Sequence, residues 1–314
     1  LMEQNNQDLA TIIINAGNKD KVDAERSEAL PPVTPSDFGG SEVSRTSFYG
    51  DAMNDDNVND LVGDIVPSVI VLIGFPEYGK STFVSSLYHL VMVNGKIGKY
   101  EFVDSDTLAG FERRSHVRNV EVASSKRLDR TPLYADYLLS MLFRNTESGE
   151  YLKLVLSDRS GEIYRKYSDK EEIFAKDKLL PYANHLVFLI DSEKLIDDNY
   201  NVEMNDDLEY LITRMNSKSM FCEGKKIDLI YNKIDKINGD KEKLATFNSK
   251  IAEIEALFPK DCTIQKKEKL SAINPIMNKD LQKFFIYLLD TCDCSAIADK
   301  QLVAQIDWAR NGWC

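Results

Sequence analysis

One stretch of the sequence combines glycines, a lysine and a serine at a spacing that suits the binding of phosphate groups. Gly74, Gly79, Lys80 and Ser81 fit the pattern G-x-x-x-x-G-K-[ST]. Glycines let the backbone wrap closely around phosphate oxygens, and the free amides and dipole of a helix that begins at Lys80 attract the same negative charge. We expect Lys80 to reach the terminal phosphates, in binding and in catalysis, and Ser81 to offer its hydroxyl to Mg²⁺.

The surroundings of this loop favour the same interpretation. A buried strand is predicted at Val69–Ile73 just before the loop, and a helix is predicted just after it. The mechanism requires this context, which makes a chance glycine-rich turn a poor alternative. We therefore assign the other members of the loop, Glu77, Tyr78 and Thr82, to the nucleotide-binding site as well.

An acidic residue follows the next predicted strand, where a second magnesium contact is needed. Asp158 and Gly161 fit D-x-x-G directly after a strand predicted at Leu152–Leu156. We expect Asp158 to hold the magnesium shell through water. The backbone amide of Gly161 can contact a terminal phosphate, so this loop would change shape when that phosphate leaves.

The residues that would assist hydrolysis are less sharply defined by the sequence. Glu162 stands where many switch proteins carry a water-orienting glutamine; it either holds a water or simply begins the next helix as a favourable first-turn acid. For the hydroxyl that closes over magnesium and the terminal phosphate we choose Thr131, with Thr107 as the second choice. Arg130 or Arg127 could swing onto the phosphates, or could be a solvated loop residue.

A further motif selects the base. Asn232, Lys233 and Asp235 fit N-K-x-D straight after a predicted strand. The Asp235 carboxylate can accept hydrogen bonds from the ring N–H and exocyclic amine of guanine, whereas adenine offers no matching pair of donors. Asn232 would tie this loop to the phosphate loop, and the stem of Lys233 would cover the base. Downstream, Ser271-Ala272 would place a backbone amide against the guanine carbonyl.

From Ser68 onward, apolar strands alternate with amphipathic helices, which predicts an α/β fold with a mostly parallel central sheet and helices on both faces. The remaining strands are predicted at Leu186–Ile190, Ile227–Tyr231 and Thr263–Leu270. The charged segment Ile97–Gly149 is longer than a simple connection requires, and long connections are usually functional.

Composition divides the chain into three parts. Residues 1–60 contain twelve acidic and four basic residues and show no sustained period, which predicts a flexible acidic tail. Residues 61–292 carry the motifs and form the nucleotide-binding domain. Residues 293–314 make a C-terminal extension. The tail and the extension are the places where we expect a protein effector or regulator to bind.

The overall charge and the cysteines exclude several functional classes. A formal charge of −12 disfavours wholesale nucleic-acid binding, because a phosphate backbone repels a negative protein. No apolar run approaches the roughly 18 to 20 residues that cross a bilayer, and no signal peptide is recognisable. Five cysteines, an odd number, suit a reducing compartment. These features predict a cytoplasmic protein without a membrane span.

Taken together, these motifs resemble the translation-factor-related (TRAFAC) class of Ras-like P-loop GTPases over about Ser68–Asp290. The resemblance implies the Ras-like fold, GTP or GDP, and magnesium. The segment Phe102–Arg114 and the Asp158–Glu162 box also look like a bacterial double-GTPase group associated with conflict and defence systems. We expect a GTPase that acts as a molecular switch. The alternative is a GTP-binding scaffold or sensor that hydrolyses little, and an ATP-dependent P-loop enzyme would leave N-K-x-D unused.

Overall fold

The described residues fold around a single twisted sheet. This computed structural model describes residues 50–54, 65–119, 136–221, 224–272 and 278–292. Eight strands pair in the order β2-β3-β4-β5-β1-β6-β7-β8. The bounds of the strands are β1 Pro67–Ile73, β2 Lys96–Ile97, β3 Tyr100–Asp104, β4 Asp136–Asn145, β5 Tyr151–Arg159, β6 His185–Asp191, β7 Lys226–Asn232 and β8 Ile264–Lys269.

The parallel half of the sheet confirms the strands predicted from sequence. β1 pairs in parallel with β5 on one side and β6 on the other, and β7 and β8 continue the parallel order. All five predicted strands therefore exist; four are longer than predicted by a few residues, and β8 is one residue shorter at each end. Because parallel strands end at the same edge of a sheet, the loops that follow β1, β5, β6 and β7 meet there.

The antiparallel half was not predicted. The segment that the sequence presented as a long connection contains β2, β3 and β4, and β4 pairs with β5 over nine residue pairs. Residues 138–141 of β4 are all buried, so the strand lacks the alternation of polar and apolar residues that marks a half-exposed strand. The sheet is consequently mixed, although the nucleotide-binding loops follow its parallel strands.

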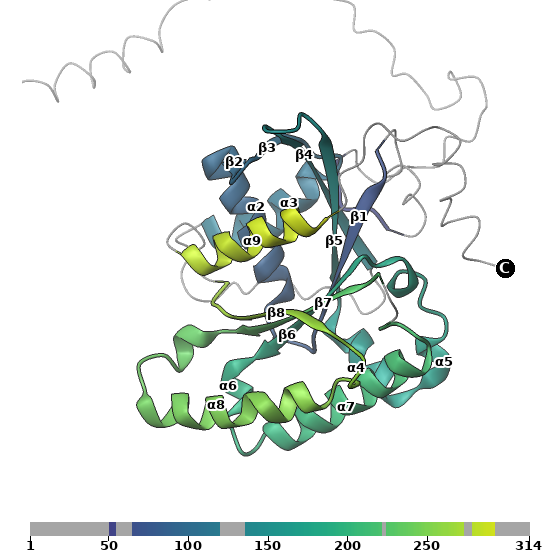
Figure 1. Ribbon diagram of the computed structural model, residues 1–314, viewed down its shortest axis with the longest axis vertical. Helices are drawn as coiled ribbons and strands as arrows, with labels where there is room; N and C mark the ends of the chain where they lie inside the picture. The colour runs from purple at the N-terminus through teal and green to yellow at the C-terminus, as the bar shows by residue number, and fades with distance from the viewer. Residues whose placement is uncertain (1–49, 55–64, 120–135, 222–223, 273–277, 293–314) are drawn as a thin grey trace, which may run out of the picture. The chain divides into compact units, whose positions relative to one another are not determined.

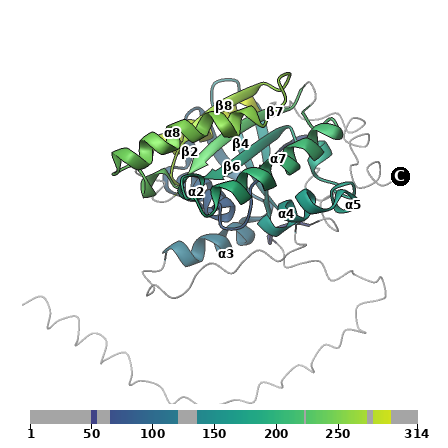
Figure 2. The same ribbon diagram turned by 90° about the horizontal axis from the view of Figure 1, so that it is seen from below.

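Helices cover both faces of the sheet, as predicted (Figures 1 and 2). On β1, Val71 points to one core cluster and Ile70 to the other. One face carries α2 Lys80–Asn94, α3 Leu108–Asn119 and α9 Lys279–Thr291. The other face carries α4 Gly161–Asp169, α5 Glu171–Phe174, α6 Ser192–Leu195, α7 Asn201–Ser217 and α8 Lys241–Ala256, with the short 3₁₀ helices η3 Leu180–Tyr182 and η4 Ile234–Lys236 in the connections. Figure 2 views the molecule from the side of α4, α7 and α8.

The apolar stripes predicted for the helices lie against the sheet. The stripes of α7 and α9 are buried throughout, and in α8 Phe247 and Ile254 are buried while Leu244 and Ile251 are partly buried. No helix within the described residues is long and apolar enough to span a membrane.

A short stretch of the range assigned to the acidic tail packs on the domain. Met53 forms an isolated antiparallel bridge with Leu138 of β4, and Ala52 is buried. Gly50 accepts a hydrogen bond at 3.0 Å from the backbone amide of Gly110 in α3. Residues 50–54, which we name the strap, therefore contact both α3 and β4. The remaining tail, residues 1–49, and the extension from 293 lie outside the described residues.

Candidate functional site

The loop between β1 and α2 has the closed shape expected of a phosphate-binding loop. Gly79, the residue before α2, has φ +89°, and Glu77 also has a positive φ of +69°. The left-handed conformation strongly favours glycine at position 79, where a Cβ would also lie 2.5 Å from the amide nitrogen of Asn232. The amide of Phe83 donates to the carbonyl of Gly79 at 2.8 Å, which starts the helix. The first amides of α2 therefore point into the loop.

Lys80 is folded back into this loop. Its ammonium group donates to the carbonyl oxygens of Gly74 at 2.5 Å and Phe75 at 3.2 Å. The side chain is buried, and burial lowers the pKa of Lys80 to about 8, against the pull of Asp158. Among the described residues no acid lies within ion-pair distance of this ammonium. The ammonium also lies over the ring of Tyr164, 5.7 Å from the centroid, and a buried cation with these neutral partners can pair with an anionic phosphate.

Ser81 and Asp158 lie together at the ends of neighbouring elements. The Ser81 hydroxyl donates to Asp158 Oδ1 at 2.7 Å, and Asp158 is 1% exposed. A hydroxyl and a carboxylate are oxygen ligands of the kind Mg²⁺ prefers, so this pair fits the magnesium site that the sequence predicts. Among the described residues no three His, Cys, Asp or Glu side chains cluster as a metal site. Magnesium held largely by phosphates and water needs no such cluster.

The D-x-x-G loop packs tightly on the phosphate loop. A Cβ on Gly161 would lie 2.3 Å from the backbone nitrogen of Pro76, so only glycine fits at this position. Glu162 follows in the first turn of α4, where its amide donates to Ser160 Oγ at 3.3 Å. The Glu162 side chain lines a pocket of about 210 Å³ that it shares with Glu77 and with α7. Its position suits both sequence interpretations, a helix-starting acid and a group beside the phosphates.

Asn232 connects the phosphate loop with the predicted base loop. Its side-chain amide donates to the carbonyl of Tyr78 at 2.9 Å, and its side-chain oxygen accepts from the amide of Ala272 at 3.1 Å. Both bonds are buried. The Ala272 carbonyl in turn accepts from Ser86 Oγ of α2 at 2.5 Å. A single asparagine therefore fixes the spacing between the phosphate loop at Tyr78 and the loop at Ala272, which lie far apart in the sequence.

The other predicted base-binding residues surround this connection. Lys233 adopts φ +62°, and its ammonium pairs with the buried Asp191 at 2.6 Å. Asp235 lies exposed in η4, directly after it. The Ser271 carbonyl accepts a hydrogen bond from Asn278, the residue that caps α9. The structure thus brings N-K-x-D and Ser271-Ala272 to one side of the phosphate loop.

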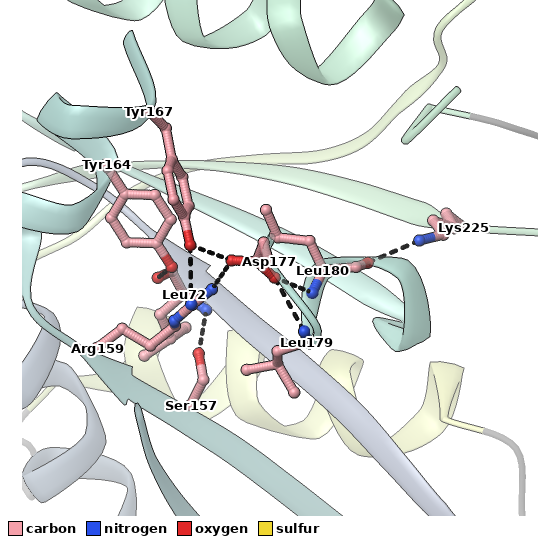
Figure 3. A network of polar contacts seen from close by, with 9 residues as sticks. All are labelled: Leu72, Ser157, Arg159, Tyr164, Tyr167, Asp177, Leu179, Leu180 and Lys225. Carbon is pink, nitrogen blue, oxygen red and sulfur yellow. Dashed lines mark hydrogen bonds and ion pairs between the residues drawn. The ribbon is translucent and has the colours of Figure 1, made fainter. Parts of the chain in front are cut away.

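Behind the D-x-x-G loop lies a buried polar network that sequence reasoning missed (Figure 3). Arg159, the residue after Asp158, pairs with Asp177 at 2.5 Å, and both side chains are almost fully buried. Tyr167 of α4 donates to the same carboxylate, whose other oxygen accepts from the amides of Leu179 and Leu180. The network therefore ties β5 and α4 to the chain that precedes β6. No local pattern in the sequence marks Asp177 as the partner of Arg159.

Some predicted residues cannot be placed or have other partners. Thr131, Arg130 and Arg127 lie outside the described residues. Thr107, the second choice for the switch threonine, is fully buried, and its hydroxyl accepts from the amide of Ser140 at 2.8 Å. In this conformation the hydroxyl of Thr107 therefore binds β4.

Arg114 lies in the site without having been predicted there. Its Nε donates to Asp158 Oδ2 at 2.6 Å. The sequence showed Arg114 only as one of several bases in a connection, because α3 was not recognised as a helix. The spacing of Gly110 and Arg114, one helical turn apart, becomes informative only once α3 is known.

Three comparisons with known proteins bear on this site. The family model of Double-GTPase 2 matches residues 68–275. No curated protein sequence matches the chain. The fold is similar to that of a protein described as nucleolar GTP-binding protein 1 from Plasmodium falciparum, at 17% identity and a TM-score of 0.37, covering 71% of this chain and 85% of that one. It is also similar to the GTPase-like domain of Ski7 from S. cerevisiae, bound to GDP and inorganic phosphate, at 18% identity and a TM-score of 0.41, covering 74% and 51%.

The matched range contains every motif described above, from the strand before the phosphate loop to Ser271-Ala272. It spans about two thirds of the chain, and the whole sheet falls within it except for Pro67, the first residue of β1. The chain belongs to the Double-GTPase 2 family, a group of P-loop GTPases.

Proposed function

We propose that this chain binds GTP together with magnesium and hydrolyses it as a regulatory switch. Membership of a GTP-binding family supports the binding of guanine nucleotide. The proposal of hydrolysis and of a switch is based on the arrangement of the site. The change of state would occur where Gly161 meets the phosphate loop, because loss of a terminal phosphate removes the partner of its amide.

The connection made by Asn232 carries the proposal. The N-K-x-D loop can read a base only if it stands at a fixed distance from the loop that grips the phosphates. The hydrogen bonds of Asn232 to Tyr78 and Ala272 set that distance through contacts within the chain. The site is therefore built in advance for one molecule that carries both a purine and a polyphosphate.

Each of the chain's own groups has a distinct task in this proposal. Lys80 leaves the carbonyls of the loop to neutralise the terminal phosphates, and Asp235 accepts from guanine. Ser81 and Asp158 hold magnesium, which supplies positive charge to the phosphate oxygens when bound. Glu162 is placed near enough to influence Lys80 electrostatically, and it holds the attacking water. As the sequence predicts, Thr131 would bind magnesium and the terminal phosphate, and Arg130 or Arg127 would contact the phosphates.

The alternative is a GTP-binding scaffold or sensor with little hydrolysis. One observation favours it: Glu162 is a carboxylate where other switches use a neutral glutamine, and a negative group beside the terminal phosphate opposes attack by water. In this case nucleotide binding would fix a surface for a partner protein and the triphosphate would persist.

Two measurements test the proposal in sequence. Fluorescence titration of the full chain with labelled GTP and ATP, with and without magnesium, should show binding of GTP that needs Lys80 and discriminates against ATP. Equal affinity for the two nucleotides would exclude the base assignment. Single-turnover hydrolysis of bound GTP then separates the two functions, because a switch releases phosphate and a scaffold retains intact triphosphate for hours.

A further inference from the structure

Both oxygens of the Asp158 carboxylate accept a hydrogen bond from another side chain of the same chain. Its Oδ1 accepts from the Ser81 hydroxyl at 2.7 Å, and its Oδ2 accepts from Arg114 Nε at 2.6 Å. The Asp158 side chain is 1% exposed and that of Arg114 is 13% exposed, so the ion pair is largely shielded from water. A buried carboxylate without a partner is costly, and here an arginine of the same chain satisfies it.

Two further contacts hold Arg114 in this position. Its Nη1 donates to the carbonyl of Gly110 at 2.9 Å, and its guanidinium stacks over the ring of Tyr137, 4.6 Å from the ring centroid. Tyr137 pairs directly with Asp158 in the register of β4 and β5. The arginine is therefore clamped between α3 and the strand next to its acid.

The helix that carries Arg114 is in turn positioned by the strap. A Cβ on Gly110 would lie 2.5 Å from the amide nitrogen of Ala52, so the strap lies directly against α3 at this glycine. Asp51 pairs with Arg113 at 2.6 Å, on the outer side of the same turn. The strap therefore fixes α3 one turn before the residue that reaches the magnesium site.

We propose that Arg114 is a built-in substitute for magnesium, which neutralises Asp158 when the metal is absent and must leave when magnesium and nucleotide bind. The inference rests on the proposed function, because it assigns magnesium to Ser81 and Asp158. A metal-bound water would donate to the same Asp158 oxygens that now accept from Ser81 and Arg114, and the positive guanidinium would be repelled by the nearby Mg²⁺. The competition raises the magnesium concentration that nucleotide binding requires.

The test replaces Arg114 with a neutral residue of similar polarity. In Arg114→Gln the competing charge is gone, so the concentration of magnesium that half-saturates binding of fluorescent GDP should fall about tenfold or more. Arg144→Gln is the matched control, since it removes the same charge from an exposed position of β4 outside the strap and the site. It should leave the magnesium requirement near that of the unchanged chain.

A second readout follows the arginine itself. In a chain labelled with ¹⁵N-arginine, the Nε–H resonance of Arg114, identified by its loss in Arg114→Lys, which keeps a positive charge beside Asp158, should shift to that of a solvated arginine when magnesium and GDP are added. GDP with a chelator should leave it in place. This measurement uses the unchanged chain, so it decides the question even if Arg114→Gln fails to fold.

The outcomes separate the inference from the function on which it rests. A chain that binds no guanine nucleotide at any magnesium concentration overturns both. A chain that binds GDP with a magnesium requirement unaffected by Arg114→Gln, or with an Arg114 resonance that does not move, keeps the function and overturns the inference. A higher magnesium requirement in Arg114→Gln would also overturn it, because Arg114 would then support the metal.

Discussion

The side-chain amide of Asn232 donates to the backbone carbonyl of Tyr78 at 2.9 Å, across 154 positions of sequence. This bond and the one from Ala272 make Asn232 the connection between the two halves of the nucleotide site. Gly79 packs directly against the side-chain amide of Asn232, where a Cβ would lie 2.5 Å from its nitrogen.

We expect Asn232→Ala to lower both stability and nucleotide affinity. The substitution leaves the Ala272 amide and the Tyr78 carbonyl without their buried partner, which costs about 1–3 kcal/mol. Chemical denaturation measures the free energy of unfolding, and titration with labelled GDP measures affinity. Asn216→Ala, at an exposed position of α7, is the control and should change neither. Unchanged affinity in Asn232→Ala would show that the two loops do not need this connection.

Asp235→Asn should change the base preference of the site from guanine to xanthine. Xanthine carries a carbonyl where guanine carries an amine, and an asparagine can accept from the ring N–H while donating to that carbonyl. We expect Asp235→Asn to lose affinity for GTP by about tenfold or more and to prefer XTP. Asp198→Asn, in an exposed loop, should keep the preference for GTP. If Asp235→Asn still preferred GTP, the base would have to be read elsewhere.

The sequence predicted the parts of the fold and site that depend on local pattern. The strand before the phosphate loop, the helix that begins at Lys80 and the stripe of α9 follow from neighbouring residues. The antiparallel strand β4 escaped prediction because residues 138–141 are buried on both faces. The position of Arg114 escaped for a different reason: its partner Asp158 lies 44 residues away, and only the pairing of β4 with β5 brings α3 over the site.

The lowered pKa of the buried Lys80 side chain predicts how nucleotide binding depends on pH. In the free protein burial lowers this pKa to about 8, whereas phosphates beside the ammonium favour its charged form and raise it. Binding should therefore take up a proton when the pH exceeds about 8, and affinity should fall by up to about tenfold per unit from there. Calorimetry of GDP binding at pH 8.5 in two buffers of different ionisation enthalpy measures the uptake. A flat affinity with no uptake would contradict the lowered pKa.

The network of Asp177 predicts a different pH dependence, at the acid end. Burial alone would raise the pKa of Asp177, but Arg159, the amide of Leu180 and Tyr167 outweigh it and lower that pKa. A carboxyl group whose pKa is lowered in the folded state stabilises the fold at any pH above its ordinary, unfolded-state pKa. This stabilisation is lost as the pH falls toward the lower pKa of the folded state. Asp177→Asn leaves Arg159 buried and unpaired, so we expect a loss of about 3–5 kcal/mol at pH 7.

This prediction is tested by comparing the free energy of unfolding at two pH values. Measured by urea denaturation at pH 7 and pH 4, the unchanged chain should lose more stability on acidification than Asp177→Asn does. The outer pair of Lys250 and Glu253 is exposed, and Glu253→Gln should leave stability and its pH dependence unchanged. Equal slopes for Asp177→Asn and the unchanged chain would mean that Asp177 does not stay ionised in the fold.

Truncation at the N-terminus should show where the tail ends and the strap begins. Removing residues 1–49 leaves every contact described for the strap, so we expect the free energy of unfolding and the magnesium requirement to stay the same. Removing residues 1–54 deletes the bridge of Met53 with Leu138 and uncovers Gly110, which should cost about 2 kcal/mol or more. Because the strap fixes α3, the longer truncation should also loosen Arg114 on Asp158 and lower the magnesium requirement. Two truncated chains with equal melting temperatures would show that the strap adds nothing to the domain, and α3 would then be held by its sheet contacts alone.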